Sequence, residues 1–114
     1  MPYIEIATNV DVDDNTARDL LSKASGLAGE MLGKPDKYVL ARISPGQMLS
    51  HGASADPAAL VTLKSIGLPK DKTGELSKKI CAFLKAELGI EGDKVYIDFA
   101  DLERSMFGWS SKTF

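Results

Sequence analysis

The chain is most constrained by a repeat, in which each half of the sequence shows the hydrophobic periodicity of a strand, a helix and a second strand. In the first half, residues 3–8 alternate as a half-buried strand does. Apolar residues at three-and-four spacing then predict a helix that starts after a capping Asp13 or Asp14 and runs to about residue 32. A second strand is expected over residues 38–43, and residues 47–56, which lack periodicity, are expected to form a loop.

The second half follows the same order. Residues 58–66 predict a third strand, which Gly and Pro residues end. A helix opened by Asp71 or Thr73 carries one apolar face and ends at Gly89, which can adopt the left-handed conformation. Residues 94–99 complete the pattern as a fourth strand. The repeat therefore predicts two βαβ units.

Right-handed crossovers would lay both helices on one face of a four-stranded sheet. The predicted fold class is accordingly α+β, with a mixed sheet, in one domain spanning residues 1–114. In residues 38–41 and 58–61, apolar residues do not alternate with polar ones, so both faces of each strand are apolar. This pattern is typical of strands that are covered on both faces. Because the sequence leaves nothing for a third layer, we expect another copy of the chain to cover the open face, with Glu5 and Lys64 finding partners at the subunit boundary.

Composition excludes several classes of function. The chain has 14 basic and 16 acidic residues with the lysines scattered, which argues against a nucleic-acid partner. No apolar run approaches the roughly 18 residues of a membrane span. The N-terminus lacks a basic stretch followed by an apolar one, so we expect a cytoplasmic protein, with leaderless export left open. Cys81 is the only cysteine and His51 the only histidine, and therefore no metal site is expected.

The first two residues carry potential chemistry. If an aminopeptidase removes Met1, the ring nitrogen of Pro2 becomes a free secondary amine that can act as a base. While Met1 remains attached, the same nitrogen belongs to an amide whose lone pair is delocalised into the carbonyl. The state of the N-terminus therefore decides whether Pro2 can take up a proton.

Six fragments of the sequence carry a resemblance that spans nearly the whole chain. They are Met1-Pro2, Thr8-Asn9-Val10, Leu32-Gly33-Lys34-Pro35, Lys64-Ser65-Ile66-Gly67, Lys94-Val95-Tyr96-Ile97, and Gly108-Trp109 with Thr113-Phe114. In this order and near this spacing they resemble the macrophage migration inhibitory factor family. The resemblance implies a homotrimer whose sheets form a central barrel. It also implies cofactor-independent keto-enol tautomerisation of phenylpyruvate-like or dopachrome-like substrates.

The same resemblance implies the site. Pro2 would be the catalytic base, Lys34 would hold the carboxylate of an aromatic keto acid, and Ile66 would contact it through its backbone. The pocket walls would be the aromatic residues Tyr38, Tyr96, Trp109 and Phe114. Tyr96 would come from the neighbouring subunit. Asp98 stands where the animal proteins carry an amide, and its charge would repel a substrate carboxylate.

Two alternatives remain open. One is a cytokine-like protein that acts by receptor binding, with a vestigial pocket, although residues 11–14 are largely acidic where animal members carry an arginine implicated in receptor mimicry. The other is a binding domain unrelated to catalysis. Apart from the resemblance, Lys34 is typical of a solvated lysine at a helix C-terminus and the aromatic residues are typical of a core.

Overall fold

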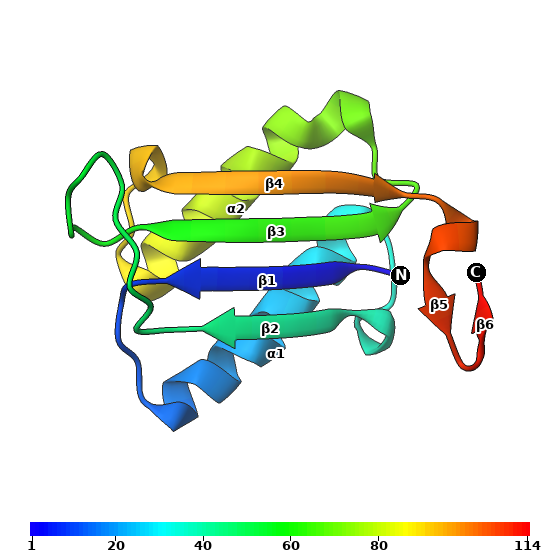
Figure 1. Ribbon diagram of the computed structural model, residues 1–114, viewed down its shortest axis with the longest axis horizontal. Coiled ribbons are helices and arrows are strands. Elements are labelled where there is room, and N and C mark those ends of the chain that lie inside the picture. Colours follow the sequence, from blue (N-terminus) through cyan, green and yellow to red (C-terminus); the bar gives the residue numbers. More distant parts are fainter.

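The computed structural model describes all 114 residues and contains one four-stranded mixed sheet in the order β2-β1-β3-β4 (Figure 1). The strands are β1 (Tyr3–Thr8), β2 (Leu40–Ser44), β3 (Ala59–Ile66) and β4 (Val95–Leu102). β1 runs parallel to β2 and antiparallel to β3, and β3 runs parallel to β4. Helices α1 (Asp14–Leu32) and α2 (Thr73–Leu88) lie side by side on one face of the sheet. The predicted α+β fold of two βαβ repeats is confirmed.

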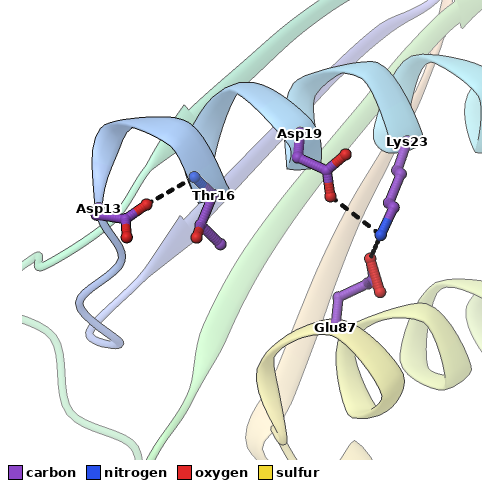
Figure 2. A network of polar contacts seen from close by, with 5 residues as sticks. All are labelled: Asp13, Thr16, Asp19, Lys23 and Glu87. Carbon is purple, nitrogen blue, oxygen red and sulfur yellow. Dashed lines mark hydrogen bonds and ion pairs between the residues drawn. The ribbon is translucent and has the colours of Figure 1, made fainter.

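The helices end where the sequence predicts. Asp13 caps α1 by accepting a hydrogen bond of 2.7 Å from the backbone N–H of Thr16 (Figure 2). Both C-caps are glycines in the left-handed region, Gly33 with φ 63° and Gly89 with φ 66°. The start of α2 differs from expectation, because Asp71 lies in a preceding 3-10 turn and no side chain caps the helix.

An ion pair links the two helices. The ammonium of Lys23 in α1 lies 3.0 Å from the carboxylate of Asp19, one turn earlier, and 2.7 Å from that of Glu87 in α2 (Figure 2). These contacts raise the pKa of Lys23, with the hydrogen bond to Glu87 as the largest cause. Because Lys23 and Asp19 are about half exposed, these ion pairs contribute little to stability.

Two strand boundaries were predicted wrongly. β2 begins at Leu40 rather than at residue 38, because Asp36–Tyr38 form a 3-10 turn (η1) after Pro35. β4 continues to Leu102 rather than ending at residue 99, because its partner β3 extends far enough to pair with it throughout. Backbone hydrogen bonding to β3, which periodicity does not reveal, sets the end of β4.

The C-terminal residues form a short turn and a small hairpin. A 3-10 turn, η4 (Arg104–Met106), leads into a small hairpin of β5 (Gly108–Trp109) and β6 (Lys112–Thr113). The two residues at its tip, Ser110 and Ser111, have φ of 52° and 64°. The hairpin lies beyond the end of the main sheet, beside the N-terminus (Figure 1).

The core lies between the helices and the inward face of the sheet. Ile4, Ile6 and Leu63 from the central strands are at most 2% exposed, and Ile80 and Leu84 of α2 pack against this face. Alternate strand residues point inward, as the pleat requires. The half-buried Cys81 also packs against this cluster.

The opposite face of the sheet is uncovered and partly apolar. Leu40, Leu60 and Tyr96 on this face are 66%, 44% and 67% exposed, which agrees with the two-sided apolar pattern of the sequence. Glu5 has a partner within the chain, because the Nε of Arg42 on the neighbouring strand lies 3.3 Å from its carboxylate. Large exposed apolar side chains of this kind are typical of interfaces.

Neither helix combines the length and the apolar character that a membrane crossing requires. No group of three or more His, Cys, Asp or Glu side chains converges as a metal site would require.

Candidate active site

A cavity of about 310 Å³ lies at the N-terminal end of β1. Its lining comprises Met1, Pro2, Lys37, Tyr38, Val39, Leu40, Phe107, Gly108, Trp109 and Phe114. Three separate parts of the chain thus meet here: the N-terminus, the turn before β2 and the C-terminal hairpin. Pro2 is fully buried within this lining. A cavity of this size and largely apolar character is typical of a small-molecule site.

The sheet topology brings these parts together. Because β1 and β2 are parallel, both begin at the same end of the sheet, and the N–H of Leu40 donates a 3.0 Å hydrogen bond to the carbonyl of Pro2. The hairpin is closed by a 3.1 Å hydrogen bond from the N–H of Phe114 to the carbonyl of Phe107. The aromatic ring of Phe114 stacks on the rings of Phe107 and Trp109, each with centroids 5.7 Å apart. The pocket therefore has an aromatic wall of three stacked rings.

The electrostatic environment of the cavity is positive. No acidic residue lines it, whereas Lys37 does, with its ammonium 5.1 Å from the centre of the Tyr38 ring. The pKa of the Met1 amine is lowered first by burial and then by the charges of Lys34 and Arg104. Burial removes hydration from the cation and like charges repel it, so both effects favour a neutral amine at this end of β1.

Four of the residues expected in the site, Pro2, Tyr38, Trp109 and Phe114, line this one cavity. Lys34 does not line it. It follows the C-cap of α1 and is exposed, yet its charge acts on the N-terminal amine.

Ile66 lies beside the start of the chain. Tyr3 pairs with Lys64 in the antiparallel register, and continuing that register places Met1 opposite Ile66. Ile66 ends β3, and the carboxylate of Asp101 fixes the turn that follows by accepting hydrogen bonds of 3.0 and 3.2 Å from the next two backbone N–H groups. The backbone at Ile66 is therefore held close to the N-terminus.

Tyr96 and Asp98 lie apart from Pro2 within one chain. Both belong to the first half of β4, whereas the register brings only the far end of that strand toward the N-terminus. Tyr96 instead lines a second cavity, of about 160 Å³, where its ring meets the edge of His51 with centroids 5.1 Å apart. Asp98 is exposed on the uncovered face, opposite Thr62. A single chain thus brings together only part of the expected site.

The sequence pattern gave no indication of several cavity residues. Lys37 belongs to the η1 turn, Val39 follows it, and Leu40 begins β2. Proximity in sequence to Tyr38 was the only available signal for these three. The convergence of the cavity lining depends on the parallel pairing of β1 with β2 and on the course of the chain after β4.

Two βαβ repeats on one four-stranded mixed sheet, with Pro2 buried behind an aromatic hairpin, define the class of fold to which this chain belongs. The family model described as "Macrophage migration inhibitory factor (MIF)" matches residues 1–114. The chain is 38% identical to macrophage migration inhibitory factor of Xenopus tropicalis over 117 residues, covering 100% of this chain and 99% of that protein. The chain belongs to the macrophage migration inhibitory factor family.

Other relatives agree with this assignment. The macrophage migration inhibitory factor homologue of Trichinella spiralis is 38% identical over 115 residues, covering 100% of both proteins. The crystal structure of a homologue from Prochlorococcus marinus superposes with a TM-score of 0.90 at 34% identity, covering 98% of each chain.

Proposed function

We propose that this protein is a cofactor-independent keto-enol tautomerase that acts on phenylpyruvate-like or dopachrome-like substrates, with Pro2 as the base after Met1 has been removed. The observation that carries the proposal is the full burial of Pro2 in the lining of an aromatic cavity. Membership of the family supports an isomerase of this kind.

The chemistry requires a base that is unprotonated near neutral pH, because it must abstract a proton next to a ketone and return it at another atom. Burial and neighbouring cations already disfavour the charged form of the amine at Met1. Pro2 lies deeper than Met1, so its amine, once freed, should experience the same effects. The aromatic-walled cavity around Pro2 supports the catalytic proposal. Measured activity separates it from the alternative of a signalling protein with a vestigial pocket.

Enol formation from phenylpyruvate, followed by absorbance on protein whose intact mass shows the loss of Met1, tests the proposal. Turnover that depends on the processed N-terminus would support it. A processed protein without activity on phenylpyruvate or a dopachrome-like compound would favour the signalling alternative.

We further propose that the active form is a homotrimer. Tyr96 and Asp98 lie far from Pro2 of their own chain, and the face that carries them is uncovered. A neighbouring copy packed against this face would both bury it and supply Tyr96 to the Pro2 pocket.

Sedimentation should therefore yield a species of about 37 kDa, three times the chain mass of 12.3 kDa. The exposed Met106 and Trp109 should contribute to the subunit contacts. A protein that sediments only as a monomer at micromolar concentration would contradict the trimer.

Lys34 is proposed to hold the substrate carboxylate. Replacing it with alanine should weaken binding of phenylpyruvate by roughly 1.5–3 kcal/mol, as expected for loss of a charge-assisted hydrogen bond. The uncharged methyl ester should bind the variant and the unmodified protein almost equally. Steady-state kinetics with both compounds measures the difference, and equal losses for acid and ester would show that Lys34 has another role.

A further inference from the structure

Three cations lie at or near the cavity that contains Pro2 and form no ion pair within the chain. Lys34, Lys37 and Arg104 take part in none of the five ion pairs within the chain, and no Asp or Glu lines the cavity. The protein as a whole carries a net charge of −2, so this local excess of positive charge is not a property of the surface in general. It favours binding of anions.

Two of these cations approach the N-terminus from opposite edges of the sheet. Lys34 precedes η1 and β2, and Arg104 opens the η4 turn that follows β4. Since β2 and β4 are the two edge strands, the turn before β2 and the turn after β4 lie on either side of the start of β1 (Figure 1). A ligand with a single carboxylate, bound at Lys34, would leave the guanidinium of Arg104 without an anionic partner.

Arg104 is attached to the aromatic wall. Its carbonyl accepts a hydrogen bond of 3.4 Å from the N–H of Phe107, which lines the cavity and stacks on Phe114. The charge of Arg104 reaches the N-terminal amine, because it lowers the pKa of that group after burial and Lys34. The backbone of Arg104 is therefore held beside the cavity by its hydrogen bond to a lining residue.

We propose that Arg104 is a second anion-binding group of this pocket, which therefore prefers aromatic acids carrying two anionic groups to those carrying one. The planar guanidinium presents paired donors that match a carboxylate. The inference rests on the proposed function in placing the first carboxylate at Lys34, but it concerns binding and does not depend on turnover.

Trp109, the only tryptophan, lines the cavity, so its fluorescence reports binding directly. The probes are 3-phenylpropanoate and 3-(4-carboxyphenyl)propanoate, which share a ring and a chain and differ by one carboxylate. The unmodified protein should bind the dicarboxylate about tenfold more tightly, and Arg104→Ala should bind the two acids with equal affinity. Arg18→Ala, which removes an exposed unpaired arginine from α1, should retain the preference.

Salt and a conservative variant refine the test. The ratio of the affinities for the dicarboxylate and the monocarboxylate should decrease as ionic strength rises. Arg104→Lys should retain part of the preference, because the charge remains while the paired donors are lost. Equal affinity of the unmodified protein for both acids, or a preference that survives Arg104→Ala, would overturn the inference.

Failure of this inference can be told apart from failure of the proposed function. If phenylpyruvate is turned over but the dicarboxylate is not preferred, only the role of Arg104 is wrong. If neither acid changes the fluorescence of Trp109 and no turnover is found, the proposed site and the role of Arg104 are both wrong.

Discussion

Inserting an alanine between Met1 and Pro2 should slow phenylpyruvate turnover by about 10²–10⁴-fold, the usual contribution of a general base. The inserted residue acylates the nitrogen of Pro2 whether or not Met1 is removed. An amide nitrogen has its lone pair delocalised into the carbonyl and cannot accept the proton. Activity measured alongside intact mass checks this expectation.

The controls separate a lost base from a lost fold. Because residue 1 lies at the cavity and outside the hydrophobic core, the insertion should leave assembly and thermal stability nearly unchanged. Pro2→Gly keeps an amine while removing the ring, and should retain partial activity. If the inserted form turned over phenylpyruvate as fast as the processed protein, Pro2 would not be the base.

Leu63→Ala should lower the free energy of unfolding by about 3–5 kcal/mol. Leu63 is completely buried in β3, between strands β1 and β4 and below the helices. Truncation would leave a cavity at the centre of the sheet, where the surrounding side chains cannot easily move to fill it. Denaturant titration at fixed protein concentration measures the loss, since assembly makes stability depend on concentration.

Leu60→Ala provides a matched control on the same strand. Leu60 points to the uncovered face and is 44% exposed, so within one subunit its truncation should cost less than about 1.5 kcal/mol. Its larger effect should be on association, because the proposed trimer buries this face. Equal losses of unfolding free energy for the two variants would contradict the assignment of the inward and open faces.

Hydrophobic periodicity predicted the elements whose boundaries are set by residues close to them in the sequence. The apolar stripe of α1, its Asp13 cap and its Gly33 stop are all encoded within a few residues, and the structure has them as expected. The start of β2 was predicted too early, because an aromatic residue at position 38 is compatible with both a strand and the 3-10 turn that Pro35 opens. The extension of β4 depends on pairing with β3, which is not local.

The site was less predictable than the fold. The resemblance named Pro2, Tyr38, Trp109 and Phe114, and the structure brings these residues to one cavity. It gave no role to Arg104, which belongs to no motif and lies near the N-terminus only because β4 extends to the end of the sheet. The hairpin itself was not predicted, because its tip has positive φ at two serines rather than at glycine or asparagine.

We propose that the amine of Pro2 acts as a base and that its pocket keeps this amine neutral near pH 7. The direct measurement is the pH dependence of kcat/KM on protein shown by mass to have lost Met1. Burial, Lys34 and Arg104 all lower the pKa of the Met1 amine, and the same effects should act on the amine of Pro2 once Met1 is removed. The base is active when deprotonated. The rate should therefore rise with pH through a single ionisation below about 7.7, the lower end of the usual α-amine range. A rate that rises only above about pH 8, or that falls as pH increases through this range, would contradict the account.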